Sequence, residues 1–280
     1  MSKSFDRIAE VNGSTLMIVD ALNLAFRYKH SKSTSFVDDY CRVVNSLKRS
    51  YKAGKVIIAC DQGSSSYRKA LYPEYKANRT EKFKDQTDEE RKEFEEFFEE
   101  FNRAILQIGT VYPVLRFDKV EADDIAAYIV GQSKKYPITD IWLISSDKDW
   151  DLLVNEHVSR FSYVTRKETR HDNWNTHYDC EPEDYISIKC LMGDTGDNIK
   201  GVDGIGPKRA VDLVKEYGSA FDIAAAIPIN SKYKYIQALN QCKDRLLLNY
   251  QLMDLVTHCD EALGDNCYEV DQLLNNYLKG

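Results

Sequence analysis

Three short apolar runs, each followed by an acidic or small polar residue, constrain the fold of this 280-residue chain most strongly. They are rich in β-branched residues and occupy Thr15–Val19, Lys55–Cys60 and Ile141–Ile144. Helical patterns lie between them, for example at Phe36–Ser50 and Ala122–Ser133. Short buried strands that alternate with helices are typical of a parallel sheet covered by helices on both faces. We therefore predict an α/β fold with a central, mostly parallel sheet, whose functional residues lie at the carboxyl ends of the strands.

A polar, basic segment at residues 64–87 contains few apolar positions, so we predict a surface excursion such as an arch or lid. A helix is predicted to begin after Thr87, because Glu90 follows at the spacing of a capping box. Six apolar residues then fall on one face of this helix, and we interpret them as a core stripe. They are Phe94, Phe97, Phe98, Phe101, Ile105 and Ile108.

The sequence changes character again near residue 180, where it predicts a helix, a glycine-rich turn and a second helix. Pro207 suits the first position of the second helix, and Gly218 suits the position just after its end. The remaining segment, Ser219–Gly280, has a helical pattern and contains no motif that indicates a function.

Nine acidic residues lie where a predicted strand ends or a predicted helix or turn begins. They are Asp20, Asp61, Asp147 and Asp149 after the strands, Glu121, Asp123 and Asp124 at a helix start, and Asp194 and Asp197 in the segment GDTGDN. Any one of them alone is explained as an ordinary helix cap. Parallel strands end at one edge of a sheet, however, so several of these carboxylates are predicted to lie together. Their repulsion and desolvation would destabilise the fold unless cations lie between them.

Oxygen ligands without cysteine or histidine suit Mg²⁺ or Mn²⁺. The carboxylates are more than one ion needs, so we predict two ions about 4 Å apart that clamp the attacking and leaving oxygens of a phosphodiester. The net charge of −7 would by itself disfavour a nucleic-acid-binding protein. Two bound divalent cations would offset about four of the negative charges at the site.

Three segments are candidates for contacts with nucleic-acid phosphates. In GVDGIGPKRA, glycines precede a helix whose free N–H groups and positive dipole suit a phosphate. The candidate residues there are Gly201, Gly204, Gly206, Lys208 and Arg209. Aromatic and basic side chains also occur together at Tyr75, Lys76 and Arg79, and at Arg27, Tyr28, Lys29 and Lys32. Taken alone, the segment with Lys76 is better explained as a solvated basic loop, and the segment with Arg27 has the same composition.

Five segments between residues 14 and 218 together resemble the 5′→3′ exonuclease/flap endonuclease family, most closely its tailed-bacteriophage members. The segments are VDALNLAFRYKH, PEYKANR, VEADDIAAYIV, WLISSDKDWD and LMGDTGDNIKGVDGIGPKR. The resemblance implies a Rossmann-like, PIN-like nuclease core at 1–180 with a helical arch at 72–103. It also implies a helix–three-turn–helix at 182–218 within a carboxy-terminal part at 181–280.

The resemblance further implies an activity and a cofactor: cleavage of DNA that has a 5′ flap or a free 5′ end next to duplex, with two Mg²⁺ ions. Mn²⁺ would substitute, and the helix–three-turn–helix would bind K⁺. One ion would lie near Asp20, Asp61, Glu121, Asp123 and Asp124. The other would lie near Asp149, Asp194 and Asp197, with Asp147 between the two. Lys76 would be the active-site lysine at the base of the arch, and Arg79 its neighbouring arginine.

Two other functions remain open from the sequence: a non-catalytic DNA-binding relative that keeps the fold, and a PIN-like ribonuclease. The first would have lost metal carboxylates, and the predicted arch disfavours the second. The seven cysteines form no CxxC pair, and the start MSKSFDRIAE has no apolar run, so we expect a cytoplasmic protein with free thiols. We also expect a monomer that does not contact membranes.

Overall fold

The computed structural model describes residues 12–29 and 35–279, so the first eleven residues and Lys32 lie outside the described residues. Its centre is a six-stranded sheet with the order β3-β2-β1-β4-β5-β6. The first five strands in this order are parallel, and β6 is an antiparallel edge strand. The strands are β1 (Asn12–Asp20), β2 (Ala53–Ala59), β3 (Val114–Leu115), β4 (Asp140–Ile144), β5 (Val158–Ser162) and β6 (Lys167–Thr169). The predicted α/β class and mostly parallel sheet are confirmed.

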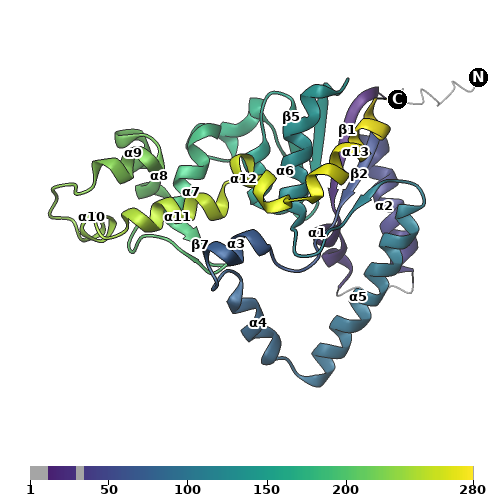
Figure 1. Cartoon of the computed structure of the whole chain (residues 1–280), viewed down its shortest axis with the longest axis horizontal. Helices are drawn as coiled ribbons and strands as arrows, with labels where there is room; N and C mark the ends of the chain where they lie inside the picture. The colour runs from purple at the N-terminus through teal and green to yellow at the C-terminus, as the bar shows by residue number, and fades with distance from the viewer. Residues whose placement is uncertain (1–11, 30–34, 280) are drawn as a thin grey trace, which may run out of the picture.

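Alternate side chains of the strands face two separate cores, as the two-residue period of a strand requires. From β1, Leu16 and Ile18 pack with α6 (Ala122–Gln132), α12 (Leu255–Leu263) and α13 (Asn266–Leu278). Met17 and Val19 face the other way, toward α2 (Phe36–Ser50) and α5 (Asp88–Gly109). Helices therefore cover both faces of the sheet, with the carboxy-terminal α13 lying near β1 and β2 (Figure 1).

The basic segment forms two short helices before the long α5. α3 (Ser66–Leu71) lies against the body of the molecule, whereas α4 (Ala77–Lys84) projects from it and meets the start of α5 at a tip (Figure 1). The capping box at Thr87 and Glu90 is present as predicted. The predicted stripe is buried at Phe97, Phe101, Ile105 and Ile108 and only partly buried at Phe94 and Phe98. The end of α5 that lies nearest the tip therefore leaves aromatic surface open to solvent.

Residues 182–253 form a smaller helical unit with its own apolar core. It consists of α7 (Tyr185–Met192), the hairpin β7 (Gly193–Asp194) and β8 (Ile199–Lys200), α8 (Pro207–Tyr217), α9 (Ala220–Ala226), α10 (Lys234–Leu239) and α11 (Lys243–Met253). Pro207 begins α8, and Gly218 ends it in the left-handed region at φ 97°, both as predicted. The chain then returns to the sheet through α12. Over the described residues, no helix is both long enough and apolar enough to cross a membrane.

Candidate metal-binding active site

The acidic edge of the sheet is formed where β2, β1 and β4 end side by side. Asp20 is the last residue of β1, Asp61 follows β2, and Asp147 follows β4. The hydroxyl of Ser145 donates a hydrogen bond to Asp20 Oδ2 over 2.7 Å and accepts one from the backbone N–H of Asp147 over 3.0 Å. One serine therefore fixes two of the carboxylate-bearing segments relative to each other, at the edge that the parallel sheet predicts.

The start of α6 adds carboxylates to this edge. Asp61 Oδ1 accepts a hydrogen bond from the backbone N–H of Ala122 over 3.1 Å, so Asp61 joins β2 to the start of α6. Asp123 accepts a hydrogen bond from the indole Nε1 of the fully buried Trp150 over 2.5 Å. Glu121 precedes α6 and is almost fully buried. The orientation of each carboxylate is thus set by a backbone or side-chain donor.

A second group of carboxylates surrounds Lys189 of α7. Its ammonium Nζ lies 2.5 Å from Asp149 Oδ1 and 3.7 Å from Asp194 Oδ2. Sequence analysis did not single out Lys189, although a lysine inside the apolar run YISIKCLM is itself a signal, because a buried lysine requires a partner. Asp149 and Asp194 are therefore brought together as predicted, with a cation between them.

A third group forms around Lys76, at the start of α4. Lys76 Nζ lies 2.7 Å from Glu121 Oε1 and 3.7 Å from Asp197 Oδ2. Its backbone adopts φ 56°, a strained left-handed conformation for a non-glycine residue, and its N–H donates to the carbonyl of Asp197 over 2.9 Å. Asp197 thus shares Lys76 with Glu121, whereas the prediction placed it in the group of Asp149. It lies between the two groups that the prediction separated.

Two predicted site residues have other roles in the structure. Both oxygens of the buried Asp124 accept hydrogen bonds from Arg68, at 2.7 and 2.8 Å, so this predicted metal ligand is paired with a protein cation in the structure. Tyr75 is only 2% exposed, and its hydroxyl lies 2.9 Å from Glu121 and 3.0 Å from Asp197. It therefore orients two carboxylates and is not placed to contact DNA.

Burial and crowding shift the acidity of these groups in opposite directions. Burial, with repulsion from neighbouring carboxylates, raises the pKa of Asp20 and Asp123 well above the usual value. Burial also raises the pKa of Asp149 to about 6, although Lys189 opposes the shift. Burial alone would raise the pKa of Glu121, but the cations of Lys76 and Arg68 hold it below the usual value. Asp20, Asp123 and Asp149 therefore bind a proton more readily than an exposed aspartate does, whereas Glu121 loses its proton more readily than an exposed glutamate.

The donor set fits divalent cations, because every candidate ligand is a carboxylate oxygen. Over residues 12–29 and 35–279, no group of three or more acidic, histidine or cysteine side chains is arranged so that it could already hold one metal ion. The ammonium groups of Lys76 and Lys189 instead lie against the carboxylates. The residues that would hold cations are Asp20, Asp61, Glu121, Asp123, Asp147, Asp149, Asp194 and Asp197.

The raised acidities predict how pH and metal ions affect stability together. A carboxylate whose pKa is raised by folding binds protons more tightly in the folded chain than in the unfolded chain. Without metal, the free energy of unfolding should therefore fall as the pH rises from the usual pKa of an aspartate through about 6. Divalent cations compete with these protons. We therefore expect added Mg²⁺ to raise the Tm more at about pH 8 than at about pH 5. Calorimetry measures the Tm at both pH values, with Mg²⁺ and with NaCl of the same ionic strength. An equal rise of the Tm at both pH values would contradict this expectation.

The glycine-rich segment near α8 combines structural and exposed positions. A Cβ atom at Gly201 would lie 2.1 Å from the carbonyl oxygen of Met192, so this glycine serves internal packing. Gly204 has φ 78°, and Gly206 caps α8. Arg209 donates to the carbonyl of Gly204 over 2.6 Å and stacks on Tyr235, with 4.5 Å from Cζ to the ring centre.

The other basic candidates lie on the surface near α4 and α5. Arg79 is exposed and its Nη2 contacts Asp197 Oδ1 over 2.5 Å. Arg27 is exposed and lies over the ring of Tyr163, 4.0 Å from its centre, and Lys29 is exposed and lies 4.8 Å from the ring centre of Phe94. Arg27 and Lys29 therefore combine cationic and aromatic surface, as predicted, whereas Arg79 belongs to the Lys76 group.

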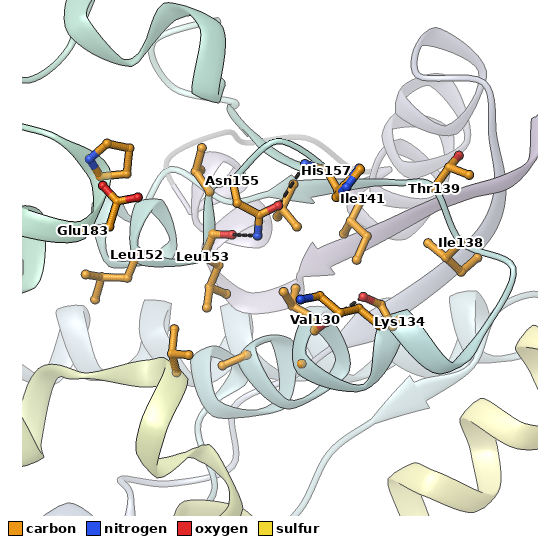
Figure 2. A pocket seen from close by; sticks show the side chains of 17 residues that line it. Val130, Lys134, Ile138, Thr139, Ile141, Leu152, Leu153, Asn155, His157 and Glu183 are labelled. Carbon is orange, nitrogen blue, oxygen red and sulfur yellow. Dashed lines mark hydrogen bonds between the residues drawn. The ribbon is translucent and has the colours of Figure 1, made fainter.

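A cavity of about 380 Å³ lies elsewhere in the molecule. Figure 2 shows its lining, which includes Val130, Ile138, Ile141, Leu153, His157 and Glu183. Ile138 and Ile141 flank the beginning of β4, whereas Asp147 follows its end. Because the cavity lies at the opposite end of β4 from Asp147, it is separate from the acidic edge. Its lining is mainly apolar.

Comparison with known proteins relates this arrangement to an enzyme family. Residues 15–179 match the model of the 5′-3′ exonuclease amino-terminal, resolvase-like domain, and residues 180–273 match that of the 5′-3′ exonuclease carboxy-terminal SAM fold. The chain belongs to the 5′-3′ exonuclease family. It is 42% identical over 272 residues to the flap endonuclease of Escherichia phage T5, covering 94% of this chain and 93% of that protein.

Solved structures of the same family agree with this assignment. The T5 5′-exonuclease with bound divalent metal ions (zinc) has a TM-score of 0.90 at 40% identity, covering 94% of this chain and 99% of that chain. A T5 flap endonuclease in a pseudo-enzyme–product complex with DNA and metal ions has a TM-score of 0.88 at 41% identity, covering 94% and 98%. The acidic edge of this chain therefore lies in a fold that these solved structures share.

Proposed function

We propose that this 5′-3′ exonuclease family member is a structure-specific nuclease, acting as a flap endonuclease and 5′→3′ exonuclease on DNA at single-strand/duplex junctions. The observation that carries the proposal is the acidic edge, where carboxylates from three adjacent strand ends, the start of α6 and the β7–β8 hairpin lie together. The similarity to a phage flap endonuclease over nearly the whole of both chains supports the substrate class. We also propose a setting in phage DNA replication, within the host cytoplasm, for which the same similarity is the support.

Mg²⁺ is the proposed cofactor, as two ions, with Mn²⁺ as a substitute. When bound, the two ions would supply Lewis-acid stabilisation of both the attacking and the leaving oxygen of the phosphodiester. The carboxylates of the acidic edge would hold them, and the buried donors Ser145 and Trp150 would keep Asp20 and Asp123 oriented. We also propose K⁺ binding near the turn before α8, and a monomeric protein.

Lys76 is proposed as the catalytic cation. Burial alone would lower the pKa of Lys76, but Glu121 and Asp197 raise it, so the ammonium group stays charged. A phosphodiester gains negative charge when it is attacked, and a positioned cation stabilises that state more than the ground state. Arg79 is exposed beside Lys76 and would contact the same strand.

The remaining elements are proposed to hold the DNA. Residues 1–180 would form the catalytic core, with the arch at 72–103 receiving the single strand. The helix–three-turn–helix at 182–218, within the carboxy-terminal part 181–280, would grip the duplex. Lys29 lies beside Phe94 of α5, the second limb of the arch, and Arg27 lies over Tyr163, so cationic and aromatic side chains occur together there, as suits single-stranded DNA.

Removing the charges at the start of α8 tests the duplex contact. Replacing Lys208 and Arg209 together with alanine is expected to weaken DNA binding uniformly across sequences and to lower the salt slope of log K by up to about two. Turnover at saturating DNA should change little, because these contacts are equal in ground and transition states.

A salt titration on a flap duplex measures this slope, and Lys208→Ala alone serves as a comparison, because Arg209 also contacts Gly204 and Tyr235. Unchanged affinity and slope in the double variant would place the duplex elsewhere, for example along Arg27 and Lys29.

The ends of the cleavage product test the proposed chemistry. Hydrolysis with two metal ions should leave a 5′-phosphate and a 3′-hydroxyl. A flap duplex cut at its junction should therefore yield a nick that DNA ligase seals without further treatment. A nick that ligase seals only after phosphorylation of the 5′ end would overturn this chemistry.

A further inference from the structure

Arg68 of α3 is buried, although it lies in a mainly polar and basic segment. Its side chain is only 4% exposed. Nη1 and Nη2 donate to the two oxygens of Asp124 over 2.7 and 2.8 Å, and Nε donates to the backbone carbonyl of Leu252 over 2.8 Å. Nη1 also lies 3.5 Å from Glu121 Oε2. One guanidinium group therefore joins the acidic edge to a carbonyl more than one hundred residues further along the chain.

Leu252 belongs to the corner between α11 and α12, residues 249–254. The corner is fixed by its own hydrogen bonds: Asp254 accepts from the backbone N–H groups of Val256 and Thr257 and donates its N–H to the carbonyl of Tyr250. Asp254 is 5% exposed. These hydrogen bonds hold the corner in place. The Leu252 carbonyl, which belongs to it, can therefore fix the position of Arg68.

The same corner also holds the β7–β8 hairpin. The amide nitrogen Nδ2 of Asn249 donates to the carbonyl of Cys190, over 2.8 Å, and to that of Lys200, over 2.9 Å. Asn249 is 2% exposed. Cys190 lies in α7, just before the hairpin that carries Asp194 and Asp197, and Lys200 is the last residue of that hairpin. A single turn of α11, from Asn249 to Leu252, therefore contacts both Arg68, on the Glu121 side of the acidic edge, and the segments that flank the hairpin side.

We propose that the α11–α12 corner sets the spacing of the two halves of the metal site, with Arg68 and Asn249 as positioning residues. The inference rests on the proposed function and deepens it by assigning a role to the carboxy-terminal helices. Arg68 fits this role because its planar fork binds Asp124 with two N–H groups and Leu252 with a third, which a lysine ammonium does not reproduce. Residues that orient metal ligands typically change metal affinity by about 10–100-fold when replaced.

Arg68→Lys is the first test, and Asn240→Leu is the control for lost stability. Asn240 is partly buried in the helical unit, where its Nδ2 donates to the carbonyl of Ile229 over 2.9 Å and its Oδ1 accepts from the N–H of Ile229 over 2.8 Å. Both changes should lower the Tm, because each leaves polar groups without their partners. Only Arg68→Lys is expected to weaken Mn²⁺ binding, by about 10-fold or more, in a titration of the whole protein followed by electron paramagnetic resonance.

Kinetics on a flap duplex supply the second readout. With Arg68→Lys, kcat at low Mn²⁺ should fall and recover at high Mn²⁺, while the KM for DNA stays within about two-fold of wild type. Asn249→Leu removes the other support and should also weaken Mn²⁺ binding, which keeps the test available if Arg68→Lys does not fold.

Three outcomes would overturn the inference: wild-type Mn²⁺ affinity in Arg68→Lys, wild-type affinity in Asn249→Leu, or an equal loss of affinity in Asn240→Leu. Mn²⁺ binding is measured without cleavage. A wild-type protein that binds Mn²⁺ but does not cut a flap would therefore refute the proposed function, while the spacing inference would still be decided by the variants.

Discussion

Replacing Asp149 with asparagine is expected to lower flap cleavage by at least about 10³-fold, more than the loss of one neutral hydrogen-bond donor to a transition state. Asp149 is a partly buried carboxylate beside Asp194, and both share the ammonium group of Lys189. Asparagine has the same shape but removes the negative charge that would hold a divalent cation. DNA affinity should change little, because the proposed duplex contacts at Lys208 and Arg209 are untouched.

Asp197→Asn is expected to behave like Asp149→Asn, since Asp197 lies between Lys76 and Arg79 at the same edge. Asp140→Asn is the matched control, because Asp140 is exposed at the beginning of β4, away from the strand ends. Single-turnover cleavage and DNA binding in Ca²⁺ separate chemistry from affinity. Near-normal turnover in both Asp149→Asn and Asp197→Asn would refute the assignment of these carboxylates.

Replacing Lys76 with alanine is expected to lower kcat by about 10²-fold or more, which is the usual effect of losing one electrostatic group at a developing charge. Lys76 Nζ lies 2.7 Å from Glu121, inside the acidic edge, and its ammonium group stays protonated. The loss should appear in kcat and in kcat/KM alike, because the interaction is strongest in the transition state.

Lys55→Ala provides the comparison for Lys76→Ala. Lys55 lies in β2, with its ammonium 5.0 Å from the ring centre of Tyr277, among the carboxy-terminal helices. This variant should keep wild-type turnover. A Lys76→Ala protein altered only in KM would show that Lys76 holds DNA and does not act on the reacting phosphate.

The sequence predicted the strands that are apolar throughout but not the shorter or more polar ones. β1, β2 and β4 are buried on both faces, so their apolar runs identified them. β3 has only two residues, and β5 contains Arg160, which is buried only because it pairs with Asp151. That pairing depends on tertiary structure, which no local pattern reports.

The same limit explains the outcome at the candidate site. The strand-end carboxylates lie at one edge because parallel topology requires it, and spacing was enough to predict this. Spacing does not show which way a side chain faces, so Asp124 was assigned to a metal ion although it pairs with Arg68. Tyr75 was likewise assigned to DNA although it is buried against Glu121. Lys189 was missed because its partners are distant in the sequence.

The most direct test of the account compares a labelled 5′-flap duplex with single-stranded RNA, each incubated with and without Mg²⁺. We predict cleavage of the flap duplex at the junction only when Mg²⁺ is present, and little cleavage of the RNA. Cleavage of the flap without any divalent cation, or a preference for the RNA, would contradict the account.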